Sequence, residues 1–458
     1  MEISSKERGQ IFALNPPSNS VWSFSGGFPI VSFQIAQQNK YLDPKSLRLN
    51  GKFRVRGPGG IKPDNTDNVS GAATGIALSG RVGVASCINQ ITLSTSSNQT
   101  LEVIRNYNRM LSTLIPVTHS QSDLDTCLQV ADPASASRSF NSARGINETT
   151  DFSIPLRTGL LSGGELLALG TNGLRGLNLN LELAPDSQVI SGYRTYDADN
   201  VETPVLFTPL ATGAYYELED LNLTYDLLVP DAQGQSIMEA PATGSLSYNS
   251  FSQLYSVINA SEQTQNFNFG VSNCLAVTHN FIPTNRINNY NYDGFATSGL
   301  LNSDNTEAIF KRVTYLRGST RFPIDYEIEV GGRRDLPADQ DRPLTELATE
   351  FIDSVKPYIS MDHSLISPQT QNGLSDTLTF DNVATPRRAN TLAEPNRKVT
   401  GCGVVMDPFS KVGVDFRNTN YGLRLVSNLD GQSPNSIYTF IRARNTLNYS
   451  PAGISVSS

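Results

Sequence analysis

Histidines, cysteines and paired carboxylates are the residues of this chain that could carry out catalysis or bind a metal. The three histidines, His119, His279 and His363, lie far apart along the sequence and far from other candidate ligands. Acid–base catalysis and metal binding need several such groups at one point, so three isolated imidazoles supply little for either. His119 and His279 each follow Val-Thr in strand-like surroundings, which favours a hydrogen-bonded structural role.

The cysteines and the paired glutamates give no stronger indication of a catalytic or metal-binding site. The chain contains no CxxC, and we interpret the widely spaced cysteines as buried free thiols rather than disulfides or metal ligands: Cys87, Cys127, Cys274 and Cys402. Glu327 and Glu329 would lie on one face of a single strand, whereas a glycosidase needs two carboxylates that face each other across a cleft. A solvated strand face fits this pair better.

Two further groups could bind a partner. The aromatic residues Tyr290, Tyr292 and Phe295 stand among asparagines and could form a sugar platform, although a loop packed at a subunit junction is the preferred interpretation. Arg387 and Arg388 are better explained as interface ion-pair partners than as a nucleic-acid site. No GxSxG, HExxH, P-loop or GxGxxG motif occurs. We therefore predict no catalytic residue, no metal site and no bound cofactor, so that the protein is not an enzyme.

The elements that would position these residues are mostly strands. Strict alternation of apolar and polar residues, the period of a strand with one buried face, occurs at 47–55, 177–183, 221–227 and 326–330. Two segments predict helices: Leu101–Leu114, capped by Asn98 or Thr100 and stopped by Pro116, and Pro343–Pro357. Long polar stretches separate the strands, and loops of that length are usually ordered by neighbours.

Length and charge limit the class of protein. A chain of 458 residues exceeds what a single hydrophobic core usually holds, which predicts two domains. The net charge of −8 argues against a protein that binds nucleic acid directly through its phosphates. Charges at Glu2, Lys6, Glu7 and Arg8 argue against a signal peptide, and no window is apolar enough to span a membrane. We expect synthesis inside the cell without membrane crossing.

The first residues form a third unit in this prediction. Residues 1–22 carry mixed charges and few apolar side chains, so we expect an N-terminal arm that a neighbouring molecule orders. Its proposed anchors into apolar pockets of that neighbour are Phe12, Leu14 and Trp22. The predicted domains are residues 23–205 and residues 206–458, the latter with a C-terminal tail.

The order of segments resembles the double jelly-roll major capsid proteins of double-stranded DNA viruses, especially those of polinton-like viruses and virophages. In the first half the resemblance rests on Phe28–Phe33, Tyr41–Pro44, Cys87–Leu93 and Phe152–Leu156. In the second half it rests on Leu316–Gly318, Gly401–Val404, Asp407–Pro408 and Gly413–Phe416. The match extends over most of the chain.

The resemblance implies an all-β protein of two tandem eight-stranded jelly-roll sandwiches with short inserted helices. It also implies a homotrimeric, pseudo-hexameric capsomer. Copies of this capsomer would tile the icosahedral shell of a virion. The partners would be further copies of the chain and minor capsid and vertex proteins, with no sequence-specific nucleic acid; an internal membrane beneath the shell is compatible with this role. Alternatives left open are a viral or secreted β-sandwich protein that binds a glycan or receptor, a polysaccharide-degrading enzyme, and a minor capsid protein.

Overall fold

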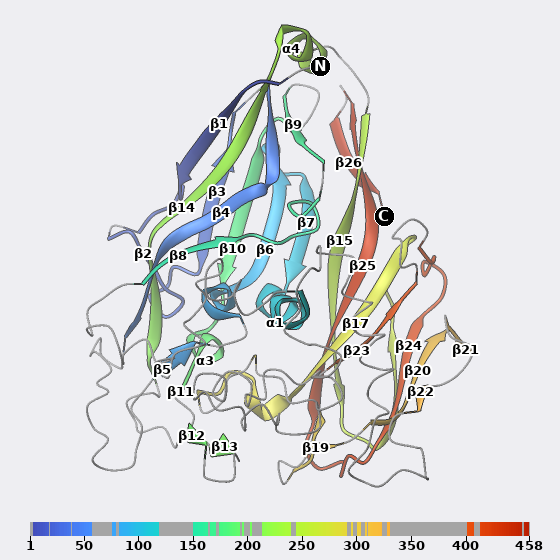
Figure 1. The fold of residues 1–458 in the computed structure, drawn as a ribbon. Coiled ribbons are helices and arrows are strands. Elements are labelled where there is room, and N and C mark those ends of the chain that lie inside the picture. The colour runs from blue at the N-terminus through green and yellow to red at the C-terminus, as the bar shows by residue number, and fades with distance from the viewer. Residues whose placement is uncertain are drawn as a thin grey trace, which may run out of the picture.

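The computed structural model describes most of the chain. The described residues are 3–17, 19–37, 39–56, 76–78, 82–118, 150–163, 165–170, 174–192, 195–196, 202–203, 213–239, 244–290, 295, 300–303, 307–308, 310–322, 328–329, 401–406, 413–450 and 453–457. Figure 1 shows two β-sandwiches side by side, with the first half of the chain on the left and the second half on the right.

The first sandwich consists of two antiparallel sheets. Sheet 1A has the strand order β1-β14-β4-β8, with β2 beside β14 and β9 beside β4. Its strands are β1 (Ile3–Phe12), β2 (Val21–Trp22), β4 (Lys40–Arg56), β8 (Thr150–Pro155), β9 (Leu167–Leu169) and β14 (Tyr215–Pro230). Sheet 1B has the order β3-β10-β6-β7 and comprises β3 (Ile30–Ile35), β6 (Ile88–Thr95), β7 (Thr100–Arg105) and β10 (Leu177–Leu183).

The second sandwich repeats this plan. Sheet 2A has the order β15-β25-β17-β23, with β26 beside β25, and comprises β15 (Gly244–Ile258), β17 (Cys274–Pro283), β23 (Gly401–Val405), β25 (Asn435–Ser450) and β26 (Gly453–Ser457). Sheet 2B has the order β16-β24-β20-β21, with β22 beside β20. Its strands are β16 (Glu262–Phe267), β20 (Phe310–Arg317), β21 (Thr320–Arg321), β22 (Ile328–Glu329) and β24 (Tyr421–Ser427).

The two sandwiches have the same connectivity. If the eight principal described strands of each half are numbered along the chain, one sheet has the order 1-8-3-6 and the other 2-7-4-5, in both halves. This order is that of a jelly roll. The predicted fold of two tandem jelly rolls is therefore confirmed, and each half is called a roll below.

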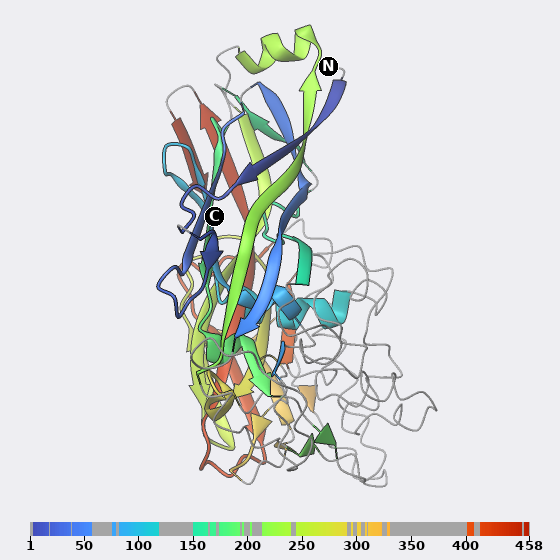
Figure 2. The ribbon, with the colours of Figure 1, turned by 90° about the vertical axis from the view of Figure 1, so that its left-hand side faces the viewer.

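Shorter elements lie around the rolls. The helices are α1 (Tyr107–Thr118), α3 (Asp186–Val189) and α4 (Ala232–Glu239), and the 3-10 helices are η3 (Gly83–Cys87) and η5 (Thr284–Arg286). Two-stranded pairs are formed by β5 (Ile76–Leu78) with β11 (Ile190–Gly192), β12 (Thr195–Tyr196) with β13 (Glu202–Thr203), and β18 (Leu300–Leu301) with β19 (Glu307–Ala308). In Figure 2, α4 caps one end of the molecule, next to the N-terminus.

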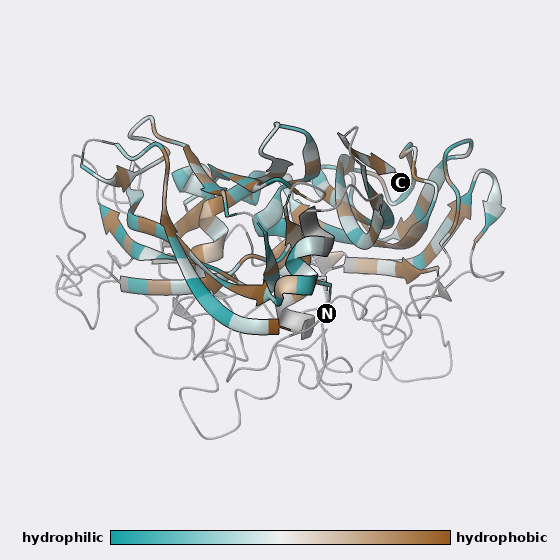
Figure 3. Cartoon of the chain, turned by 90° about the horizontal axis from the view of Figure 1, so that it is seen from above, coloured by the Kyte–Doolittle hydropathy of each residue, from teal (hydrophilic) through white to brown (hydrophobic). Residues whose placement is uncertain are grey.

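The alternating patterns mark the strands because each strand buries one face. Leu177, Leu179, Leu181 and Leu183 of β10 are all buried, whereas Asn180 and Glu182 are exposed. Seen from above in Figure 3, hydrophobic and hydrophilic residues alternate along the strands of both sandwiches. A separate apolar core fills the second roll between sheets 2A and 2B, and it includes Val277, Phe281, Leu423 and Ile441.

Strand β14 corrects the predicted domain boundary. The predicted second roll spans residues 206–458, but β14 pairs with β1 and β4 and is the last strand of the first roll. Its buried side chains, such as Leu221 and Leu223, join the first core. The two rolls are therefore joined through the segment that carries α4, between β14 and β15.

The N-terminal segment also differs from its prediction. Residues 3–12 form β1, which pairs with β14 from Ile3 to Phe12 and so becomes the edge strand of sheet 1A. The segment is ordered by hydrogen bonds to its own chain, because the edge of β14 offers unpaired backbone groups. Arm and first roll are one unit.

The predicted helix at 101–114 begins later than expected. Thr100–Arg105 forms β7, which pairs with β6, and α1 begins only at Tyr107, after Asn106 with a positive φ of 49°. Leu101, Glu102 and Ile104 are all buried on this strand, whose register with β6 shifts between Thr100 and Glu102, so burial here does not follow the two-residue period of a strand. The helix ends at Thr118, beyond Pro116. The second predicted helix, 343–357, lies outside the described residues.

Candidate assembly interface

The two rolls pack through an apolar junction. The outer face of sheet 2A, which points away from the second core, carries Phe251, Ile282, Tyr438 and Phe440, and these join the core cluster of the first roll. They meet the side of the first roll that carries β7 and α1, and Figure 1 shows α1 between the sandwiches. Every described side chain of α1 from Tyr107 to Leu114 is buried. The helix lies beside its sandwich, and the second roll covers it.

A buried carboxylate lies at the centre of this junction. Glu102 of β7 accepts hydrogen bonds at Oε1 from the Gly159 amide (3.0 Å) and the Ser250 hydroxyl (3.0 Å), and at Oε2 from the Leu160 amide (3.0 Å). Ser250 belongs to β15 of the second roll. Burial raises the pKa of Glu102 above its ordinary value, and the hydrogen bonds partly offset that rise. A buried charge with several donors fixes the position of each donor.

Further polar contacts fix the angle between the rolls. The Tyr248 hydroxyl donates to the Leu101 carbonyl (2.7 Å), and Asn280 Nδ2 donates to Thr113 Oγ1 (3.0 Å). The Arg109 guanidinium of α1 lies over the rings of Phe295 (4.7 Å) and Tyr438 (5.1 Å). Such contacts are directional, so the junction holds one relative orientation of the rolls.

The predicted anchor residues separate into two groups. Phe12 and Leu14 are 66% and 61% exposed, whereas Trp22 is 2% exposed and belongs to the core of its own roll. Trp22 therefore cannot enter a neighbour's pocket, because its ring already fills a place between the two sheets. This part of the prediction is corrected.

Phe12 and Leu14 belong to a larger apolar patch. Five of the large hydrophobic side chains that are exposed among the described residues lie close together in the sequence. We call them the B–C patch, after the letters B and C that the first two principal strands of a jelly roll carry, here β1 and β3: Phe12, Leu14, Phe24, Phe28 and Ile30. Exposed large hydrophobic side chains that gather in one region of a domain often mark an interaction site. The patch lies at the edge of the first roll where β1 and β2 lead into β3.

Hydrogen bonds hold the patch in place on β3. The Leu14 amide donates to the Ser32 carbonyl (2.8 Å). Asn15 donates from Nδ2 to the Ile30 carbonyl (3.0 Å) and accepts from the Ser32 amide at Oδ1 (3.1 Å). This segment covers backbone groups on the free edge of β3, which would otherwise attract other strands. The patch therefore offers side chains rather than a strand edge.

The sequence contains a signal for this patch in its distribution of charge. No charged residue occurs from Gly9 to Asn39, although 17% of the whole chain is charged. Depletion of charge and enrichment of aromatic residues are typical of interface cores. Phe24, Phe28 and Ile30 could have been found in this way.

The histidine and the three cysteines that the structure describes are all buried inside the rolls, and His279 lies opposite Cys402 on the neighbouring strand. His279 is buried between Thr439 Oγ1 (2.8 Å from Nδ1) and the Tyr421 hydroxyl (2.9 Å from Nε2), and burial lowers its pKa to about 3. This is the structural role that the sequence predicts. Cys87, Cys274 and Cys402 are buried free thiols. Glu329 lies on β22, and the residues outside the described ranges are His119, His363, Cys127, Glu327, Tyr292, Arg387 and Arg388.

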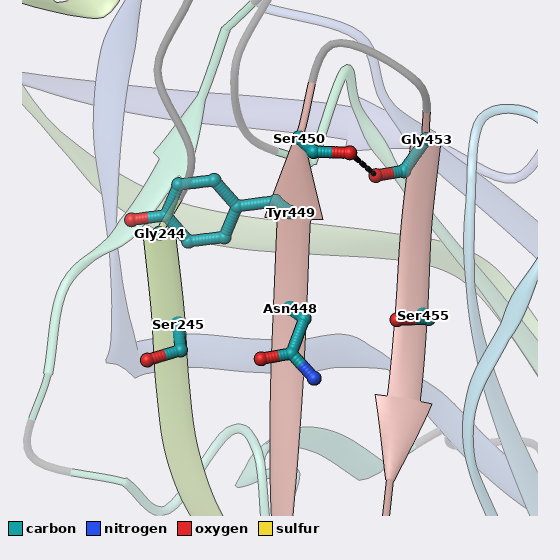
Figure 4. A pocket seen from close by; sticks show the side chains of 7 residues that line it. All are labelled: Gly244, Ser245, Asn448, Tyr449, Ser450, Gly453 and Ser455. Atoms are coloured by element: carbon teal, nitrogen blue, oxygen red, sulfur yellow. Dashed lines mark hydrogen bonds between the residues drawn. The ribbon is translucent and has the colours of Figure 1, made fainter.

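The described residues of the aromatic cluster, and the one aromatic ring at a surface hollow, are explained by packing. Tyr290 donates its hydroxyl to the Ala214 carbonyl (2.9 Å), and Phe295 is buried. An open hollow of about 450 Å³ lies over the ends of β15, β25 and β26, lined by small polar side chains (Figure 4). Its aromatic residue, Tyr449, lies over Gly244, where a Cβ atom would come within 2.2 Å of the ring. That ring is explained by packing on the glycine.

The described residues contain no cluster of three histidine, cysteine or carboxylate side chains that could hold a metal ion. None of the helices in the described ranges is both long and apolar enough to cross a membrane.

Comparisons with known proteins identify the fold. No family model and no curated protein matches the sequence. Among solved structures, the chain is similar to VP54 of PBCV-1, with a TM-score of 0.58, 12% identity and coverage of 100% of this chain and 98% of that one. It is also similar to a chain of the Sputnik virophage (TM-score 0.54, 11% identity, 99% and 88% covered). The mavirus major capsid protein gives a TM-score of 0.50 at 10% identity, with 98% and 90% covered.

The matches extend over essentially the whole chain, including both rolls. The protein thus has the double jelly-roll fold, and its structural neighbours are major capsid proteins of double-stranded DNA viruses. The resemblance that the sequence suggested is confirmed at the level of the fold.

Proposed function

We propose that this chain is a major capsid protein, a structural component of a virion without catalytic activity. The observation that supports the proposal is the match of both rolls, in one arrangement, to solved capsid proteins over 98–100% of the chain. The contacts around Glu102 agree with such a role, because a building block for a regular shell needs a fixed angle between its halves.

The assembly unit in this proposal is a homotrimer. Two similar rolls in each chain, repeated three times, give a nearly hexagonal outline from a threefold oligomer, and closed symmetry requires complementary heterologous faces. Trimers would pack into an icosahedral shell together with minor capsid and vertex proteins.

The B–C patch is the surface that we assign to contacts between capsomers. It replaces the free N-terminal arm of the sequence analysis, since β1 is already paired, and it retains Phe12 and Leu14 from the predicted anchors. Burying large apolar side chains against a neighbour stabilises the contact by about 1.5–3 kcal/mol for each side chain that becomes fully buried.

Light scattering and electron microscopy of the purified protein test the proposal. We expect a particle of about three times the chain mass of 49.8 kDa, and hexagonal outlines or shells in the micrographs. A protein that stays monomeric at all concentrations and forms no ordered assemblies would exclude the proposed role. Saturable glycan binding by an isolated oligomer would favour the receptor-binding alternative.

A further inference from the structure

The C-terminal strand β26 lies at an edge of sheet 2A. Within the described part of the chain β26 pairs with β25 alone, in an unbroken register from Ser450↔Gly453 to Thr446↔Ser457. Its alternate residues Gly453, Ser455 and Ser457 are exposed, and no described atom comes within 4 Å of a Cβ placed on Gly453. Figures 1 and 2 show β26 toward the end of the molecule that carries α4. The outer side of such a strand offers backbone N–H and C=O groups to another strand.

Other edges of the two sandwiches carry a protective feature that β26 lacks. Strand β1 has three consecutive charged residues at 6–8, and Leu14 and Asn15 cover the edge of β3. The edge of β9 is covered by the Leu174 amide, which donates to the Ala168 carbonyl (2.9 Å). The sequence of β26, Gly-Ile-Ser-Val-Ser, contains no charged residue and no proline, and its register with β25 has no bulge. Because charge, proline, bulges and covering segments are the usual protection against strand addition, β26 is open to it.

The two faces of β26 specify the kind of strand that fits beside it. Ile454 and Val456 are partly buried against the core cluster of the first roll. On the opposite face Ser455 lies in a row with Asn448 of β25 and Ser245 of β15, and the open hollow of about 450 Å³ lies over this row (Figure 4). A strand that continues the sheet must therefore alternate apolar side chains on the first face with small uncharged polar side chains on the second.

We propose that β26 pairs in antiparallel orientation with β26 of a second copy of this chain, so that sheet 2A continues from one molecule into the other. The inference rests on the proposed self-assembly and names one contact between capsomers. It commits to a second copy because β26 is complementary to itself. With Ser455 opposite the same residue of the partner, Gly453 faces Ser457 and Ile454 faces Val456, so apolar residues meet apolar residues and serines meet small residues. A slip by one residue would turn the apolar side chains of one copy toward the polar face of the other.

The symmetry of this contact gives it a defined place in an assembly. Two identical strands paired in this way are related by a twofold axis through the Ser455 pair, so the contact is isologous and joins two copies only. It therefore links neighbouring capsomers, whereas the capsomer itself is held by heterologous contacts. Pairing over five residues is weak in isolation, but a trimer presents three such strands, and multivalency makes weak contacts effective in a lattice.

A pair of cysteine substitutions tests the register. In the proposed pairing the two Ser455 positions lie directly opposite each other, whereas the two Ser457 positions are about 13 Å apart, four residues along the strand. A disulfide needs Cα atoms within about 7 Å. We expect oxidised assemblies of Ser455→Cys to give at least about fivefold more disulfide-linked dimer on non-reducing gels than those of Ser457→Cys. The wild type, treated in the same way, measures the contribution of the native thiols.

A pair of lysine substitutions tests the same contact by repulsion. Ser455→Lys would place two like charges directly opposite each other across the twofold axis, which disfavours strand pairing. Ser247 is exposed on the same face of the sheet but lies on β15, away from the proposed contact, so Ser247→Lys is the control. We expect Ser455→Lys to raise the concentration at which capsomers form larger assemblies by about tenfold, and Ser247→Lys to leave it within about twofold. Circular dichroism and light scattering establish that both variants fold and keep the capsomer mass.

The outcomes separate this inference from the proposed function. If the wild type assembles and Ser455→Cys gives no more dimer than Ser457→Cys, β26 does not pair with itself, although self-assembly stands. Strong crosslinking of both variants would indicate random contact of the chain ends and would also overturn the pairing. Impaired assembly of Ser455→Lys without crosslinking of Ser455→Cys would assign the edge to another partner. A wild type that stays monomeric under all conditions would overturn the proposed function as well.

Discussion

The Glu102 carboxylate of the first roll and the Ser250 hydroxyl of the second lie 3.0 Å apart in a hydrogen bond that crosses the junction. Both residues are buried, and Glu102 receives backbone amides of Gly159 and Leu160 at the same time. A buried acceptor with donors from both rolls loses more than one contact if either roll moves. The Glu102 carboxylate therefore keeps its full set of hydrogen bonds only in this relative orientation of the two rolls.

Removing one donor should weaken the junction measurably. We expect Ser250→Ala to lower the free energy of unfolding by about 1.5–3 kcal/mol, because it removes a hydrogen bond to a charged and buried group. The exposed Ser252 on the same strand supplies the matched control, and Ser252→Ala should change stability by less than about 0.5 kcal/mol. Thermal or denaturant unfolding of the three proteins measures the difference. Equal stability of the two variants would show that the hydrogen bond from Ser250 to Glu102 does not stabilise the fold.

Gly159 is required by a close approach between the rolls. A Cβ atom on this residue would lie 1.6 Å from the Asn249 carbonyl oxygen, and both are backbone positions that a side-chain rotation cannot relieve. We expect Gly159→Ala to destabilise the protein by about 3 kcal/mol or more, or to separate the rolls. Gly270→Ala is the control, since nothing lies within 4 Å of a Cβ there. Unfolding midpoints compare the variants, and a wild-type midpoint for Gly159→Ala would contradict the tight junction.

His279 should make the second roll sensitive to acid. Burial lowers its pKa to about 3 from the ordinary 6.5, so the unfolded chain binds a proton more readily than the folded one. The stability that the neutral imidazole contributes is complete above pH 6.5 and is lost as pH falls toward 3. Between pH 6.5 and pH 5 the loss is about 2 kcal/mol.

A variant isolates this effect. Glu102 has a raised pKa and titrates with the opposite sign, so its contribution is present at low pH and is lost as pH rises. The free energy of unfolding is measured for the wild type and for His279→Gln at pH 7, 6 and 5. Because both proteins contain Glu102, its contribution to the pH dependence cancels in the difference between them. We expect His279→Gln to be less stable at pH 7, since its amide cannot match both hydrogen bonds, but to lose less stability on acidification. Parallel curves would assign the acid sensitivity to other groups.

The sequence predicts the strands better than their partners. Alternation identifies β4, β10 and β14, because a strand with one buried face must alternate. It does not identify the sheet, and β14 belongs to the first roll because of the long-range pairing with β1 and β4. Such pairing depends on residues about 160 to 230 positions away, which no local pattern records.

The candidate interface was partly predictable for similar reasons. Phe12, Leu14 and Trp22 are all apolar near the N-terminus, and only the packing of the sheets decides that Trp22 is buried and the other two exposed. For α1, Leu101 and Ile104 fit the helical period and also lie buried on β7, so the positive φ of Asn106 decides the boundary. The family resemblance supplied the double jelly roll, which the alternation alone left among several sandwich folds.

The B–C patch leads to the last prediction, which concerns assembly rather than folding. Phe12 and Leu14 are largely exposed, so replacing both by serine removes little buried surface from the single chain and should change its unfolding midpoint by only a few degrees at most. If neighbouring capsomers cover the patch, the same change removes two apolar contacts, each about 1.5–3 kcal/mol when fully buried. The Phe12→Ser, Leu14→Ser protein should therefore form oligomers of normal mass, but shells should appear only at a concentration at least about tenfold higher in turbidity and electron microscopy.

Ile3→Ser is the control, because Ile3 is also half-exposed and apolar on β1 but lies at the far end of the strand. Trp22→Ala should behave in the opposite way, with a loss of about 3–5 kcal/mol in folding stability, since Trp22 fills the core. Shells that form from the double variant at the wild-type concentration would show that the patch faces something other than a neighbouring capsomer.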